Sequence, residues 1–106
     1  MNTRRPMTLN EVRKRGLSYR RLDFWATRGW IRPTHAGGSG NTRVWPEAEL
    51  RIADLMRRLT AAGLAADVAA RAARACVEGD RLLVTIGPGV VLAIDTDLLA
   101  EEARQP

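Results

Sequence analysis

Residues 17–45, LSYRRLDFWATRGWIRPTHAGGSGNTRVW, carry the strongest structural signal in the chain. Ser18 is a preferred helix N-cap residue, and Gly29 is placed to end the helix that Ser18 begins. After this helix come a short apolar piece, a glycine-rich segment and a returning piece at residues 42–45. This order predicts a helix followed by a two-stranded hairpin with a glycine-rich tip.

The predicted helix has two different faces. Leu22, Trp25 and Ala26 recur at helical spacing and are expected to face inward. Arg20 and Arg21 lie in the first turn and are therefore expected to face outward. The helix presents a basic tip on an apolar base.

A capping box lies upstream of this helix. Thr8 and Glu11 match the T-x-x-E pattern, in which the hydroxyl and the carboxylate each satisfy a free backbone donor. The pattern predicts a short helix over residues 9–15, with Leu9 and Val12 facing inward. A tight turn of about three residues separates the two helices, which is typical of a helix-turn-helix. With the hairpin that follows, the arrangement is that of a winged helix-turn-helix.

The composition limits the class of protein. The chain has 106 residues, enough for one domain with a modest core. It holds no apolar run near the roughly 18 residues of a membrane span and no signal peptide, which favours the cytoplasm. Cys76 is the single cysteine and His35 the single histidine, so neither a disulfide nor a zinc site is expected. We expect Cys76 to be buried and His35 to be exposed.

Basic residues concentrate in the first half of the chain. Residues 1–45 hold ten basic and two acidic residues, whereas residues 46–106 hold seven basic and ten acidic ones. A codon bias explains arginine in place of lysine, but it does not segregate charge along the chain. A basic half of this kind is expected of a polyanion-binding face. We therefore predict that the chain binds duplex DNA and not a membrane.

The expected DNA contacts come from the helix tip and from the returning strand. A side chain at the tip can reach a base or a phosphate, and the alternative is an ordinary solvated charge. Arg43, beside the glycine-rich tip, can enter a minor groove or hold a phosphate, and a plain surface position is an equal alternative. Trp25, Trp30 and Trp45 are expected in the core. The predicted contact residues are Tyr19, Arg20, Arg21, Arg28 and Arg43.

The second half begins with two predicted helices. Residues 46–62 form the first, with Pro46 at its first helical position. Its apolar stripe consists of Ile52, Leu55, Met56 and Leu59. The pairs expected on its outer face are Glu47 with Arg51 and Asp54 with Arg58. An alanine-rich helix follows over residues 65–78, and its narrow apolar edge consists of Val68, Ala72 and Cys76.

Residues 81–86 and 90–95 are aliphatic runs joined by Gly-Pro-Gly, which predicts a β-hairpin. Neither run alternates with polar residues, so we expect both faces of the hairpin to be covered. The alanine-rich helix can cover one face. The other face, or a strand edge, is left for a second copy, so a homodimer through residues 82–94 is expected. Thr96 is expected to cap a last short helix over residues 97–103.

Enzymatic motifs are missing from the sequence. The glycine-rich segment at residues 37–40 precedes a strand-like piece and lacks the lysine of a P-loop. One histidine and one cysteine do not form a credible nucleophile and base, and the carboxylates are expected on solvated helix faces. We predict that the chain is not an enzyme and needs no cofactor or metal.

Residues 8–74 resemble the MerR family of winged-helix transcriptional regulators. The resemblance rests on the Gly-Leu-Ser turn, on SYRRLDFW, on RGWIRP, on the RVW where the family has Arg-x-Tyr, and on LTAAGL. The resemblance implies DNA contacts in the major groove from the recognition helix, and backbone or minor-groove contacts from the wing. The matching positions are Ser18, Tyr19, Arg20 and Arg21 in the helix and Thr42 and Arg43 in the wing. Family members continue into a long dimerising helix that is missing here, so the usual dimer, inducer binding and metal sensing are not implied.

These observations predict an α+β fold with two parts. Residues 1–78 are expected to form the MerR-like winged helix-turn-helix, and residues 79–106 a C-terminal β-hairpin with a short terminal helix. The expected function is sequence-specific binding of duplex DNA by a transcriptional regulator at the nucleoid. One alternative is an excisionase-like or phage packaging factor. A second is a protein-interaction adaptor that uses the hairpin edge.

Overall fold

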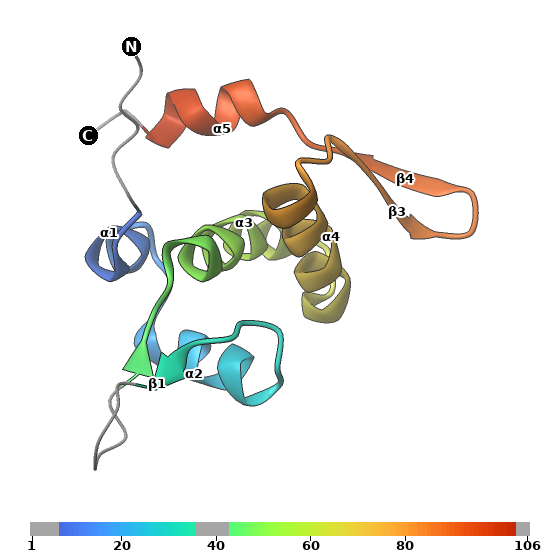
Figure 1. Cartoon of the computed structure of the whole chain (residues 1–106). Helices are drawn as coiled ribbons and strands as arrows, with labels where there is room; N and C mark the ends of the chain where they lie inside the picture. Colours follow the sequence, from blue (N-terminus) through green and yellow to red (C-terminus); the bar gives the residue numbers. More distant parts are fainter. Residues whose placement is uncertain (1–6, 36–42, 104–106) are drawn as a thin grey trace.

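The computed structural model describes residues 7–35 and 43–103 (Figure 1). The helices are α1 (Leu9–Lys14), α2 (Tyr19–Thr27), α3 (Glu47–Ala61), α4 (Ala66–Gly79) and α5 (Thr96–Ala103). The strands are β1 (Thr34–His35), β2 (Arg43–Val44), β3 (Leu83–Gly87) and β4 (Val90–Ala93). The strands form two antiparallel pairs, β1 with β2 and β3 with β4. The structure confirms the expected α+β fold, in which helices are combined with small antiparallel sheets.

Helix α3 is the centre of the fold. In Figure 1 the helix α3 lies between α1 and α4, with α2 below it. The side chains that fill the core come from all of these helices and from the turns between them. The largest fully buried ones are Val12, Leu17, Leu22, Ile31, Ile52 and Met56. The helix-turn-helix is thus held together by side chains packed on α3.

The two hydroxyl caps of the helix-turn-helix are those that the sequence predicts, whereas the Glu11 carboxylate of the expected capping box lies 3.9 Å from Arg15. The Thr8 hydroxyl accepts a hydrogen bond from the Glu11 amide (3.2 Å), and the Ser18 hydroxyl accepts one from the Arg21 amide (3.1 Å). Gly16 lies in the turn with φ +104°, a conformation that L side chains rarely adopt. These local contacts begin both helices where the sequence indicates.

The three tryptophans differ in burial. Trp25 is 3% exposed and belongs to the core. Trp30 and Trp45 are only half-buried and pack against the core from its edge, so the prediction that they lie inside is wrong in part. Each receives an edge-on aromatic ring from α2, with the ring centroids of Phe24 and Trp30 6.2 Å apart and those of Tyr19 and Trp45 6.4 Å apart.

Two expectations about α3 need correction. Pro46 is the N-cap residue and not the first helical residue, because its ψ of 146° is extended. The pair of Asp54 with Arg58 exists, with 3.9 Å between Nε and Oδ2, but it does not lie on the outer face. Asp54 is only 6% exposed and Glu49 only 7%. Two carboxylates expected in solvent are therefore buried, which matters for the site below.

Helix α4 packs on α3 through a broad face of small side chains. The buried residues are Ala69, Ala70, Ala72, Ala73 and Cys76, while Val68 is only half-buried. The predicted apolar edge was therefore too narrow. Cys76 is buried as expected. Burial, and to a smaller extent the charge of Asp80, raises the pKa of its thiol. Small side chains allow the two helix backbones to approach closely, since little volume separates them.

The β3–β4 hairpin projects beyond α4 (Figure 1). Val84 and Ile94, each 8% exposed, belong to the core. The opposite face carries Leu83 and Val91, which are 64% and 56% exposed. Among the described residues of this single chain, only one face of the hairpin is covered. The register shifts by one residue between Thr85 and Gly87, as in a β-bulge.

The last helix begins differently from the prediction. Thr96 is the first residue of α5 and not its cap. The Asp95 carboxylate accepts a hydrogen bond from the Leu98 amide (3.0 Å) and satisfies the free donor there.

Candidate nucleic-acid interface

The tip of α2 is exposed, while its base is anchored. Leu22 and Trp25 are buried in the core, so the opposite side of the helix faces outward. Ser18 and Arg20 are exposed, and Tyr19 is 44% exposed. Arg20 forms no ion pair with any residue in the described part of the chain. The tip therefore offers a hydroxyl, a phenol and a guanidinium to solvent.

Arg21 differs from its neighbour Arg20. Its Nη2 atom donates a hydrogen bond to the Thr60 hydroxyl of α3 (3.2 Å). Its guanidinium carbon lies 4.8 Å from the centroid of the Trp25 ring, a cation–π distance. Arg21 is exposed, but it is held along the flank of α2.

The strand pair after α2 brings a further arginine to the same helix. Thr34 pairs with Val44, and His35 pairs with Arg43. The Arg43 guanidinium forms an ion pair with the Asp23 carboxylate of α2. Thr42 lies outside the described residues, and so does the expected glycine-rich tip. Nothing is described of the His35 side chain, so its expected exposure stays a prediction.

Arg28 lies at the other end of α2. It is exposed, and its guanidinium carbon is 5.2 Å from the centroid of the Trp30 ring. Of the predicted contact residues that the structure describes, Ser18, Tyr19 and Arg20 gather at the helix tip. Arg43 is brought to α2 by its ion pair with Asp23, whereas Arg28 is at the far end of that helix.

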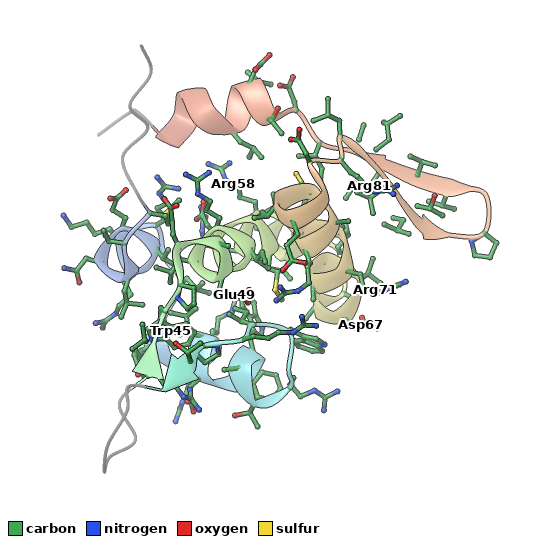
Figure 2. The ribbon with its side chains drawn as sticks, viewed as in Figure 1. Trp45, Glu49, Arg58, Asp67, Arg71 and Arg81 are labelled. Carbon is green, nitrogen blue, oxygen red and sulfur yellow. The ribbon has the colours of Figure 1, made fainter. Side chains whose placement is uncertain are left out.

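Sequence reasoning missed the buried carboxylate of Glu49, which Figure 2 shows in the middle of the molecule. It accepts hydrogen bonds from Arg74 of α4 (2.7 and 3.0 Å) and from the Arg32 amide (2.7 Å). Arg74 also donates to the Trp30 carbonyl (2.9 Å). These bonds tie the segment between α2 and β1 to both α3 and α4.

The environment of Glu49 decides its ionisation. Burial taken alone raises the pKa of the Glu49 carboxyl, but the bonds from Arg74 and from the Arg32 amide outweigh it. The pKa of Glu49 therefore lies below its usual value of 4.5. The pKa of Arg74 is raised, first by its hydrogen bond to Glu49. Both groups are charged at neutral pH.

A second arginine cluster surrounds Asp54. Its carboxylate accepts hydrogen bonds from Arg15 of the helix-turn-helix (2.7 Å) and from Arg57 (3.0 and 3.1 Å). Arg58 lies 3.9 Å from the same carboxylate. Beside this cluster is an open pocket of about 320 Å³, lined by Arg15, Gly16, Arg21, Arg57, Thr60 and Ala61. We call it the arginine pocket. Arg15 and Asp54 lie 39 residues apart in the chain, so no local sequence pattern indicates this cluster and its pocket.

The fold and this basic helix tip agree with the comparison to known families. The model of the MerR HTH family of regulatory proteins matches residues 7–76. The chain belongs to the MerR family, a family of DNA-binding, non-enzymatic helix-turn-helix regulators. No curated protein matches the sequence. None of the helices within residues 7–35 and 43–103 is long and apolar enough to cross a membrane.

Proposed function

We propose that this protein binds duplex DNA sequence-specifically and regulates transcription at the nucleoid, in the cytoplasm. The tip of α2 enters the major groove, and the β1–β2 wing contacts the backbone or the minor groove. The observation that carries the proposal is the exposed tip of α2, with Tyr19 and Arg20 in solvent and Leu22 buried behind them. A helix of about 10–12 Å in diameter fits a major groove about 12 Å wide.

Arg20 is the residue best suited to read a base. It is exposed in the first turn of α2 and is not held by an ion pair to a described residue, so its planar fork of donors is available. Arginine commonly binds guanine in a bidentate way. Ser18 and Tyr19 precede it and can donate hydrogen bonds to phosphates. Such phosphate contacts fix the register of a protein on the duplex.

The wing supports the same function through Arg43. Its ion pair with Asp23 ties β2 to α2, so the wing and the helix form one unit. When DNA approaches, a phosphate can compete with Asp23 for the guanidinium. Thr42 and Arg28 complete the proposed set of contact residues, Thr42 in the wing and Arg28 at the C-terminal end of α2.

The test is duplex binding measured by fluorescence anisotropy across salt concentrations, after selection of bound sequences from a random DNA pool. We expect affinity to fall steeply with salt, because several basic residues release counterions. Arg20→Gln is expected to cost about 1–3 kcal/mol of binding and to relax preference at one or two base pairs. Arg81→Gln, at the start of the hairpin, is the matched control (Figure 2). A chain that binds no duplex at low salt contradicts the proposal.

We also propose that two copies associate through the hairpin and so pair two half-sites. Support comes from the outer face of the hairpin, where Leu83 and Val91 are more than half exposed. Val91→Lys is expected to yield a monomer in light scattering, while Thr96→Lys, which adds the same charge outside the hairpin, leaves the dimer intact. A monomeric parent protein, or a dimer that survives Val91→Lys, removes the hairpin from this role.

A further inference from the structure

The arginine pocket lies on the flank of α2, beside the exposed tip. It is formed where the turn after α1 meets the first turn of α2 and the last turns of α3. Arg15, Arg21 and Arg57 come from these three places. Thr60 adds a hydroxyl, and no large apolar side chain lines the space. Such a lining suits a small, strongly hydrogen-bonding anion more than an organic ligand.

The charges around the pocket do not cancel. Of the three arginines that line the pocket, Arg15 and Arg57 contact the carboxylate of Asp54, and Arg21 is bonded to a neutral hydroxyl. Glu11 is the other carboxylate near the cluster, 3.9 Å from Arg15. Arg15 and Arg57 are only about 20% exposed, so their charge is screened less than a fully solvated charge.

The arginines are also held in place before any ligand arrives. Arg57 donates to Asp54 through both Nε and Nη2, and Arg21 is fixed between Thr60 and the Trp25 ring. A guanidinium has five N–H donors, and these bonds use only part of them. Because the side chains are already ordered, binding an anion costs little further conformational entropy.

We propose that the arginine pocket binds a phosphodiester of the DNA backbone beside the groove that α2 enters. This rests on the proposed function. A helix that fills the major groove has a row of phosphates along each flank, because helix and groove have nearly the same width. The pocket occupies one of these flanks. Arg21 therefore acts on a phosphate and Arg20 on a base, although they are adjacent in the sequence.

Asp54 is a positioning residue in this arrangement. Its carboxylate is buried and holds Arg15, in the turn after α1, and Arg57 of α3 toward one another. It lies behind the guanidinium groups and is not itself a ligand of the phosphate. The helix-turn-helix and the end of α3 are thereby joined into one phosphate-binding surface.

The test compares Arg57→Gln with Arg71→Gln, which removes an exposed arginine of α4. Figure 2 shows Arg71 beside α4, apart from Arg58 of the Asp54 cluster, which lies above α3 in this view. Arg57→Gln is expected to weaken binding by the same factor on the selected duplex and on a scrambled one. The slope of log affinity against log salt is expected to fall by about one. Arg57→Lys keeps the charge and is expected to restore most of the slope.

The outcomes separate this inference from the proposed function. A wild-type chain that binds no duplex overturns both. A wild-type chain that binds, with an unchanged salt slope in a folded Arg57→Gln variant, overturns the pocket alone. Arginine side-chain NMR signals provide a second measurement, and they are expected to shift with duplex and only weakly with inorganic phosphate. Tight saturation by inorganic phosphate alone would assign the pocket to a small anion and overturn the backbone assignment.

Discussion

Helix α3 carries two buried carboxylates, Glu49 near its start and Asp54 in its middle, and they organise two different regions. Glu49 is matched by one side-chain partner, Arg74, and by a backbone amide. Asp54 is shared by Arg15, Arg57 and Arg58. The first region is close to neutral and ties α4 to the segment that leads into the wing. The second brings Arg15 and Arg57 to the pocket beside the first turn of α2.

The Glu49 cluster stabilises the fold, whereas the Asp54 cluster also positions arginine side chains at the surface. A buried carboxylate with one partner is sensitive to the loss of that partner, because an unpaired charge remains in the interior. A carboxylate with three partners tolerates the loss of any one of them. Arg15 and Arg57 keep N–H donors that Asp54 does not use, and these donors are available to an anion in the proposed pocket.

The largest effect is expected from Arg74→Ala. The variant leaves Glu49 buried without its main partner, which is expected to lower the free energy of unfolding by about 3–5 kcal/mol. Chemical denaturation measures this change. Arg71→Ala, which removes an exposed arginine from the same helix, is expected to leave stability nearly unchanged. Equal stabilities for the two variants would show that the Glu49 cluster contributes little.

A smaller loss, about 1–3 kcal/mol, is expected from Asp54→Asn, since three guanidinium groups lose a charged acceptor but reach solvent at the pocket. Sulfate ions can then take the place of the carboxylate. We expect sulfate to raise the melting temperature of Asp54→Asn more than that of Glu49→Gln, because the arginine pocket lies beside Asp54. Glu49→Gln corrects for the general stabilising effect of sulfate. Equal gains would contradict the difference between the two clusters.

The Glu49 cluster also predicts a dependence on pH. The pKa of Glu49 is lower in the folded chain than its usual 4.5, so the folded state favours the ionised form. Its stabilisation is complete above the unfolded pKa and is lost as the pH falls through the lower, folded pKa. Between about pH 6 and about pH 3 we expect the stability of the parent protein to fall more than that of Glu49→Gln. Parallel curves in denaturant titrations would contradict the assignment.

The smallest effect on stability is expected from Arg43→Gln. Its ion pair with Asp23 is partly exposed, with Asp23 53% exposed, and such pairs contribute roughly 0–1 kcal/mol. Duplex affinity is nevertheless expected to fall evenly across sequences, because the proposed contact is to the backbone. Asp23→Asn is the control, since it breaks the same pair and keeps the arginine. A loss of stability as large as that of Arg74→Ala would show instead that the Arg43–Asp23 ion pair stabilises the fold.

Sequence patterns predicted the local structure better than the long-range contacts. The capping residues Thr8 and Ser18 indicated where α1 and α2 begin, because each cap depends on residues three positions away. The acids of α3 were misread as solvated, since a helix with acids and arginines at i,i+4 spacing looks exposed. Their partners are 25 and 39 residues away, Arg74 for Glu49 and Arg15 for Asp54, and no periodicity reports such contacts.

The bond from Arg74 to the Trp30 carbonyl has a mechanical consequence. Helix α4 carries the β3–β4 hairpin at its C-terminal end and, through Arg74, is fastened to the backbone from which the wing departs. In the proposed complex, α4 connects the hairpin rigidly to the segment that leads into the wing. Because hydrogen bonds run along its length, with roughly 1.5 Å of rise per residue, the helix moves as a rigid body when one of its ends is tilted.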